Sequence, residues 1–305
     1  MAADPLYNRG LHRWSILLAF CTLLLVVAGG LVTSRDAGLS VPDWPLSYGK
    51  LMPPMEGGIL YEHGHRMVAT TVGIFTIILM IWFFRAEKRR WMQWLGVAAL
   101  IAVIVQGVLG GLTVLLLLPW WISTAHACLA QLFFSTTVAI ALFTSDWWLR
   151  GPTPIDEDPR YPLRTLSLIA PLCVLGQLAL GAAARHKAIG SIYHICGSPI
   201  VTGVVLWISL RILLHYAGNH ELRLAAITLL GVTFLQVFLG IAAFMSRVAY
   251  ADAVQPMPIM VTFTVLHVAV GALTMASSVA LAILVRRNLT SPALAFSGAQ
   301  IAAIP

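Results

Sequence analysis

Long apolar runs alternate with short polar segments along the whole chain. The runs are about twenty residues long or longer, which is enough to cross the hydrocarbon core of a bilayer. Eight spans are expected, at residues 14–34, 66–84, 92–118, 121–144, 163–184, 188–213, 223–246 and 259–285. The pattern therefore predicts an all-α, polytopic membrane protein with eight transmembrane helices.

Two longer polar segments interrupt this pattern. Residues 35–62 form a Pro- and Gly-rich stretch between the first two spans, and we expect an outer loop there. Residues 145–162, rich in Pro and acidic residues, are expected to form an inner linker between the fourth and fifth spans. The linker divides the chain into an N-terminal half, residues 1–150, and a C-terminal half, residues 151–305.

A short repeat indicates that the two halves are related. The pattern Q-x-x-L-G begins at Gln106, Gln177 and Gln236, near the outer ends of odd-numbered spans, and residues 28–31 carry a related Ala-Gly-Gly-Leu. Small residues allow helices to approach closely, and glutamine can donate a hydrogen bond within the membrane. We therefore predict two pseudo-symmetric four-helix bundles, related by an axis along the membrane normal.

Composition and charge support the membrane class. Hydrophobic residues make up 59% of the chain and charged residues only 10%, and the mean hydropathy is +0.86. The net charge of +7 follows the ends of the spans, so it indicates membrane topology and excludes nucleic-acid binding. Thirteen of the 19 Lys and Arg residues fall on one side, which predicts that both termini are cytoplasmic. The first span is expected to stay as an anchor, because no signal cleavage site follows it.

The cysteines carry no recognisable chemistry. Cys21, Cys128, Cys173 and Cys196 all fall within predicted helices, and the chain contains neither CxxC nor CxxCH. This excludes covalent c-type haem attachment and a thiolate zinc site. We expect all four cysteines to be small apolar residues of the helix core.

Four histidines lie close to the start of the even-numbered spans: His65, His126, His194 and His267. Alternate helices run in the same direction, so the four imidazoles are expected at one depth near the outer face. One intramembrane histidine is most simply a hydrogen-bonded core residue, but four at matched positions indicate a function. Imidazoles on facing helices of a bundle can ligate a haem iron from both sides. We therefore predict two bis-histidine haem sites, one in each half.

The segment Glu62-His-Gly-His65-Arg66 precedes the second span. If the helix begins here, Glu62 and His65 share a face at spacing i, i+3, and the carboxylate could act as a general base beside a ligated haem. It could also simply complement the helix dipole. Arg66 could pair with Glu62 or contact a haem propionate. His63 is the weaker ligand candidate, since only His65 shares a face with Glu62.

The second half has no acid at the matching place before His194. This asymmetry predicts that one haem is acted upon in the N-terminal half, while the other carries electrons. His186 lies in a short outer loop with Arg185 and Lys187. These three residues could contact propionates, but a surface-loop role is the simpler expectation.

Two motifs together resemble the haem A synthase family, the haem O-oxidising enzymes of terminal-oxidase assembly. They are residues 37–46, AGLSVPDWPL, and the E-x-x-H-R of Glu62, His65 and Arg66. The similarity extends over the chain, with eight helices, two halves and four histidines. Many relatives carry a cysteine pair in the first outer loop, where this chain has Val41 and Ser47. A role that depends on that disulfide is therefore not expected here.

The resemblance implies an oxidoreductase of the bacterial inner membrane that converts the C8 methyl of haem O to a formyl by successive hydroxylations. It implies that substrate haem O is ligated by His65 and His126, with Glu62 as the catalytic acid–base group. It also implies a resident haem b held by His194 and His267. Expected partners are membrane lipid, haem O and haem A, the haem O synthase and an electron acceptor; an oligomer is left open.

Other functions also fit parts of the pattern. A di-haem b-type cytochrome would use the four histidines but not Glu62. A transporter would fit the internal repeat, and a haem chaperone would bind haem without catalysis. For the reaction, removal of electrons from the porphyrin followed by water attack is favoured. Oxygen activation would need an open iron position, which bis-histidine ligation does not leave.

Overall fold

The computed structural model describes residues 7–152, 154–158, 160 and 162–290. Within these residues the chain forms an all-α membrane bundle with eight helices long and apolar enough to cross a bilayer. The elements are α1 (Arg9–Ser34), α2 (Gly57–Ala86), α3 (Arg90–Leu115), α4 (Trp120–Phe143), α5 (Asp146–Leu149), β1 (Ile155–Asp156), α6 (Leu163–Leu166), α7 (Ile169–Arg185), α8 (Ile192–His215), α9 (His220–Ala249), α10 (Pro258–Asn288) and β2 (Leu289–Thr290).

The helix ends follow local capping chemistry. Asn8 and Asn219 cap α1 and α9, and each side chain accepts a hydrogen bond from the backbone three residues on. Pro258 occupies the first position of α10, where its missing N–H costs nothing. Inside the helices, hydroxyls such as those of Thr22 and Thr76 donate to the carbonyl four residues earlier. Polar groups are thereby satisfied within the membrane.

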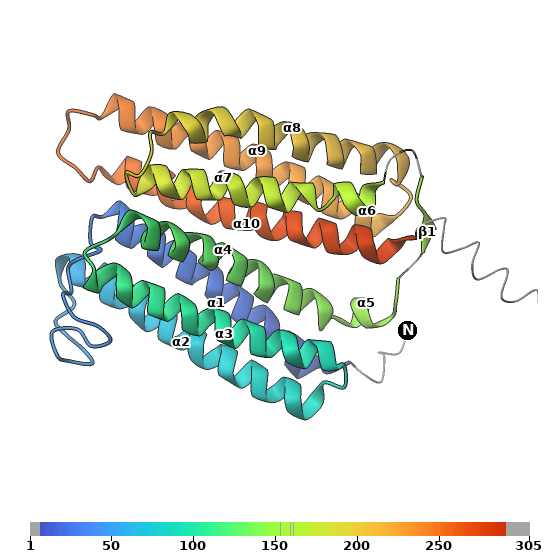
Figure 1. Ribbon diagram of the computed structural model, residues 1–305, viewed down its shortest axis with the longest axis horizontal. Coiled ribbons are helices and arrows are strands. Elements are labelled where there is room, and N and C mark those ends of the chain that lie inside the picture. The colour runs from blue at the N-terminus through green and yellow to red at the C-terminus, as the bar shows by residue number, and fades with distance from the viewer. Residues whose placement is uncertain (1–6, 153, 159, 161, 291–305) are drawn as a thin grey trace, which may run out of the picture.

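The helices form two groups of four that lie side by side (Figure 1). In the first group α2 contacts α1 and α3, and α4 contacts α3 and α1. In the second group α8 contacts α7 and α9, and α10 contacts α9 and α7. The groups have the helix membership predicted for the two halves. Their repeat symmetry and the boundary at residue 150 stay predictions.

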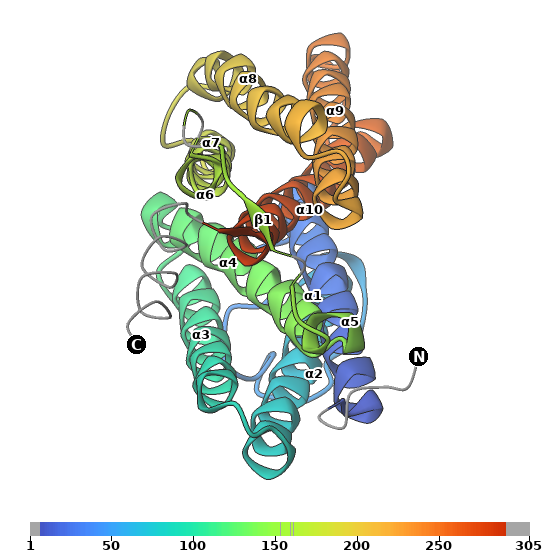
Figure 2. The same ribbon diagram turned by 90° about the vertical axis from the view of Figure 1, so that its right-hand side faces the viewer.

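Helix α10 lies at the centre of the molecule. Within its most apolar window 61% of the residues are buried, against at most 39% in any other span. It contacts α1 and α4 across the junction, and α4 also contacts α7 (Figure 2). A small core of Val26, Phe134, Ala272 and Ala276 joins α1, α4 and α10. The two halves are therefore packed against each other through these helices.

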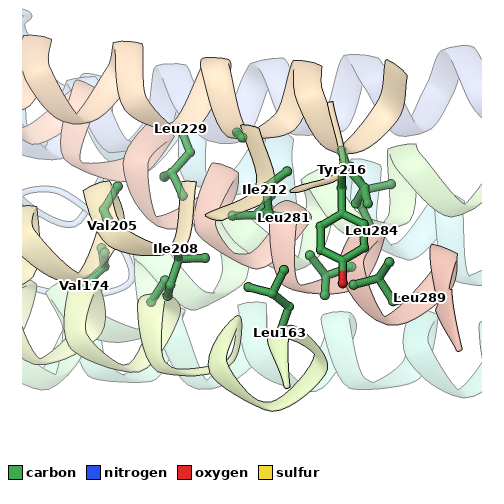
Figure 3. Close-up of a cluster of buried hydrophobic side chains, with 14 of the residues drawn as sticks. Leu163, Val174, Val205, Ile208, Ile212, Tyr216, Leu229, Leu281, Leu284 and Leu289 are labelled. Carbon is green, nitrogen blue, oxygen red and sulfur yellow. The ribbon is translucent and has the colours of Figure 1, made fainter. Parts of the chain in front are cut away.

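Each half also has its own apolar core. In the N-terminal half it contains Leu18, Leu79, Phe83, Met92 and Ile140. In the C-terminal half a larger cluster surrounds Ile208, Ile212 and Leu281 and reaches Tyr216 and Leu289 at one end (Figure 3). Both cores lie farther from the first outer loop than the four histidines do. They pack together the helices that carry those histidines.

One predicted boundary was wrong. Helix α2 begins at Gly57 and not near residue 66, so the outer loop ends at residue 56 and Glu62 is helical. Polar residues at this end are helical because the loop folds back and satisfies their side chains. The inner linker is also partly ordered: it contains α5 and β1, and β1 pairs in parallel with β2. Linker residues 153, 159 and 161 lie outside the described residues.

The start of the first long helix and the end of the last one lie at the same end of the molecule. Helix α1 begins and α10 ends at the end opposite the first outer loop (Figure 1). Residues 1–6 and 291–305, on which the predicted cytoplasmic termini fall, lie outside the described part of the chain. The side of the membrane on which each end lies stays a prediction.

Glu221 ties the linker to the C-terminal half. Its carboxylate accepts hydrogen bonds from Trp147 Nε1 at 2.5 Å and Asn288 Nδ2 at 2.8 Å. We expect Glu221→Ala to lower the free energy of unfolding by about 1–3 kcal/mol, because both donors lose their carboxylate partner. Thermal unfolding of the detergent-solubilised protein measures this. Glu56→Ala is the control, since Glu56 is exposed and its side chain makes no capping bond; equal melting of the two variants would contradict the prediction.

Candidate functional site

All four predicted histidines lie near the end of the bundle that carries the first outer loop. They are on α2, α4, α8 and α10, which all begin at that end (Figure 1). Each imidazole packs against a glycine of the preceding long helix, where a Cβ atom would lie only 2.8–3.2 Å from its Cε1 atom. The pairs are Gly29 with His65, Gly110 with His126, Gly181 with His194, and Gly240 with His267. The backbone at a glycine therefore forms one wall of the space that each imidazole occupies. We call this space the histidine seat, and the glycine beside it the seat glycine.

In the C-terminal half, the rings of His194 and His267 face each other across the bundle. Their centroids are 6.1 Å apart and their planes are nearly perpendicular, at 84°. Two imidazoles that share one iron are expected to have centres about 6 Å apart, since each nitrogen lies about 2 Å from the metal and about 1 Å from its own ring centre. The observed separation fits a bis-histidine haem.

Hydrogen bonds orient both rings for such ligation. His194 Nδ1 lies 3.0 Å from the carbonyl of Gln177, and His267 Nδ1 lies 3.1 Å from the carbonyl of Gln236. A carbonyl only accepts, so in each ring Nδ1 carries the hydrogen and Nε2 keeps its lone pair. The Gln236 amide nitrogen lies 3.4 Å from His267 Nε2 and can donate to that lone pair, so an iron bound at Nε2 would replace this contact. Backbone partners of this kind commonly orient metal-ligating histidines.

The N-terminal pair has related surroundings. His65 and His126 each pack against the glycine of the preceding long helix. Gln106 donates to the His126 carbonyl at 3.0 Å, and its amide nitrogen lies 3.4 Å from His126 Nε2. In α1 the place four residues before the seat glycine is held by Leu25 and not by glutamine. The His65 seat is therefore the one without an amide side chain.

Glu62 is buried within α2, one turn before His65, and is 4% exposed. Its Oε2 accepts the backbone N–H of Val41 at 3.0 Å, and its Oε1 accepts from Arg66 at 2.6 Å. The predicted helical face shared by Glu62 and His65 is present. The carboxylate therefore bonds to the first outer loop, and Glu62 lies in the turn of α2 that precedes His65.

Arg66 holds the loop against α2. Besides Glu62, it donates to the carbonyls of Asp43 and Leu46, each at 2.8 Å. Of the two partners considered for Arg66, the structure shows Glu62, and a propionate contact stays untested. With its terminal nitrogens shared among these acceptors, Arg66 acts as a clamp between the loop and the second helix.

His63 points to the loop and away from the histidine pairs. Its Nδ1 lies 2.8 Å from Ser47 Oγ, and both residues are buried. Asp43 tightens the same loop by accepting the backbone N–H groups of Gly49 and Tyr48. These bonds lower the pKa of the Asp43 carboxyl, because they favour its charged form. The loop thus keeps its shape at neutral pH without a disulfide.

His186 lies just past the end of α7, at the same end of the bundle. Burial, followed by the charge of Arg185, lowers the pKa of His186 below its usual value of 6.5. The ring is therefore mostly neutral at pH 7 and is not a strong anion partner there.

Sequence reasoning missed the role of the seat glycines. The Q-x-x-L-G repeat suggested close helix–helix approach, whereas its glycine receives an imidazole and its glutamine binds the histidine-bearing helix. The signal was present, because a glycine follows each of these glutamines by four residues and so lies one turn farther along the same face. Each repeat precedes a span that carries one of the four histidines, and this order agrees with the observed contacts.

The model of the COX15-CtaA family, described as cytochrome oxidase assembly protein, matches residues 12–58 and 56–198. The chain belongs to this family. The COX15-CtaA match includes Glu62, His65, Arg66, His126 and His194 and ends before His267.

The chain is also similar to curated proteins named heme A synthase. It is 26% identical over 196 residues to one from Exiguobacterium sibiricum, covering 63% of this chain and 64% of the relative. It is 30% identical over 193 residues to one from Symbiobacterium thermophilum, covering 60% and 61%. The chain thus matches less than two thirds of the length of these relatives.

The seat glycines can be tested directly. We expect Gly181→Ala to reduce haem content about fivefold or more, because the new methyl would meet the His194 ring at 2.8 Å and displace it. Pyridine haemochrome analysis of the purified protein measures haem per chain. Gly176→Ala on the same helix is the control, since a Cβ there meets nothing within 4 Å. Equal haem content in the two variants would show that the glycine seat is not needed.

Proposed function

We propose that this COX15-CtaA protein is a haem A synthase, which oxidises the C8 methyl group of haem O to a formyl group. The observation that carries the proposal is the pair of histidine seats in each half, with a 6.1 Å ring separation in the C-terminal one. Similarity to proteins named heme A synthase supports the substrate class. The two pairs then have different tasks.

The C-terminal pair would hold a resident haem b. His194 and His267 would ligate its iron through Nε2, the nitrogen that the Gln177 and Gln236 carbonyls leave available. When bound, this haem supplies a one-electron redox centre. The chain's own contribution is to fix both rings and to surround them with apolar helices.

The N-terminal pair would bind the substrate, haem O, with His65 and His126 as axial ligands. The first outer loop is clamped to α2 beside this site through Glu62 and Arg66. The proposed substrate site therefore has a polar cover that restricts access of bulk water, whereas the C-terminal half has only short outer loops. The substrate haem reacts and needs a carboxylate beside it, whereas the resident haem does not. The presence of Glu62 in the N-terminal half fits this difference.

The reaction replaces a C–H bond of the porphyrin methyl with oxygen from water. Removing two electrons and one methyl proton from the substrate gives a benzylic-like cation. Water attacks this cation and loses a proton, with Glu62 as the proton acceptor. Repeating the two steps gives a geminal diol that loses water. In sum one methyl and one net water yield one formyl, four electrons and four protons. The electrons leave to a one-electron acceptor outside the chain.

Glu62 suits this role because its carboxylate is buried, fixed and paired. Arg66 holds one carboxylate oxygen in an ion pair at 2.6 Å, and the Val41 N–H orients the second oxygen. A carboxylate fixed in this way can act as a general base. Two axial histidines leave no open position on the substrate iron, which favours electron removal over oxygen activation there. A haem is too large for a narrow tunnel through the bundle, so we propose lateral entry from lipid.

The remaining expectations complete the proposal. The protein would lie in a bacterial inner membrane with both termini cytoplasmic, receive haem O from a haem O synthase, and deliver haem A to terminal-oxidase assembly. None of these partners requires nucleic acid, and the oligomeric state is left open.

Haem extraction after expression with a haem O supply tests the activity. We expect Glu62→Gln to lower the haem A to haem O ratio about 100-fold or more, because the proton acceptor is lost while the shape is kept. Glu56→Gln changes an exposed acid six residues earlier and should leave the ratio unchanged. Chromatography of the extracted haems gives the ratio.

The alternative functions predict different haems in the extract. Haem b alone in the wild type and in both variants would contradict the synthase and favour a di-haem electron carrier. Haem A at wild-type levels in Glu62→Gln would overturn the role of Glu62 and leave a different proton acceptor to be found.

A further inference from the structure

Two arginines, Arg185 and Arg247, lie at the outer ends of α7 and α9 (Figure 1). In the proposed function these helices provide the glycine seats of His194 and His267. Arg185 is four residues beyond Gly181, and Arg247 is seven residues beyond Gly240. Both offsets are close to whole turns, so each arginine is on the seat face of its helix, about 6 Å and about 10 Å nearer the outer end.

The two helices flank the histidine pair. Helices α8 and α10 carry the histidines, and each of them contacts both α7 and α9. A porphyrin ligated between α8 and α10 therefore turns its edges toward α7 and α9. The porphyrin edge that faces the outer end of the bundle would then lie next to the two arginines.

The charges of these arginines lack a matching acid. Neither residue forms an ion pair within the described part of the chain. Arg185 is partly buried and donates to Ser34 Oγ at 2.8 Å, and Arg247 acts on it electrostatically as a like charge. Asp36, an exposed residue, is the acid that also acts on Arg185. Arg247 is exposed, so the pair consists of one partly buried and one exposed guanidinium group. Two such groups that interact as like charges favour an anionic ligand between them.

The N-terminal half has no such pair. Four and seven residues beyond Gly29 on α1 are Thr33 and Asp36, and the same offsets beyond Gly110 on α3 give Val114 and Leu117. Arg35, the cation at the end of α1, is on another face, and its guanidinium lies over the ring of Tyr61 at 5.4 Å. The paired cations above the histidine seats are therefore confined to the C-terminal half.

We propose that Arg185 and Arg247 bind the two propionate carboxylates of the haem in the C-terminal half, and that this clamp makes that haem the resident one. The inference rests on the proposed function, because it assumes haem at these histidines. It replaces the surface-loop role expected for Arg185. Without such a clamp, the N-terminal half can release its haem, as a site for substrate and product must.

The rate of haem b loss from the full-length protein tests the clamp. Excess apomyoglobin captures released haem, and absorbance follows the transfer. We expect Arg185→Gln combined with Arg247→Gln to release haem b about tenfold faster or more, since two charge-assisted contacts are lost. The pair Arg185→Lys and Arg247→Lys should restore much of the retention. Arg223→Gln, at the other end of α9, is the control and should release haem b at the wild-type rate.

A second measurement separates carboxylate binding from a structural role. Protein expressed under haem limitation is loaded with protohaem or with its dimethyl ester. The wild type should lose the ester about as fast as the double glutamine variant loses protohaem, and the variant should not distinguish the two. Equal loss of acid and ester from the wild type, or equal retention by wild type and variant, would overturn the clamp. Wild type without any haem b would overturn both the clamp and the proposed function.

Discussion

The contact between an imidazole ring and a bare helix backbone underlies the arrangement of this protein. Four histidines must be placed within a membrane bundle, and each needs both space and a hydrogen-bond partner. A glycine on the preceding helix provides the space, and in the C-terminal half a carbonyl one turn earlier fixes the tautomer. Because each seat uses two consecutive long helices, every half must contain two such hairpins, and facing histidines follow from packing the hairpins together.

The halves differ clearly at the end of the bundle that carries the first outer loop. The N-terminal half has the loop of residues 35–56, clamped through Arg66 and Glu62 beside the seat of His65. The C-terminal half has short outer connections and two arginines above its seats. The same four-helix arrangement thus carries two different sites. The N-terminal site has Glu62 and is covered by the loop of residues 35–56, whereas the C-terminal site has two arginines and only short connections above it. This division suits a substrate that enters, reacts and leaves beside a cofactor that remains.

Much of the fold could be predicted from the sequence, because apolar length alone locates membrane helices and all eight spans were found. The start of α2 was missed, because its first turns contain glycines and the polar stretch from Glu62 to Arg66, which bonds to the folded-back loop. The partner of Arg66 was left open, because the choice between Glu62 and a propionate depends on where Val41 to Ser47 return. Histidine spacing pointed to the pairs, but the 6.1 Å separation needed the packed helices.

The central claim is that each half holds its own bis-histidine haem and that the two haems differ in role. The most direct measurement is the haem composition of two purified double variants, made with a haem O supply. His65→Ala with His126→Ala should keep haem b and lack haem O and haem A, whereas His194→Ala with His267→Ala should lose haem b. Loss of haem b from the first variant, or its full retention in the second, would contradict the account.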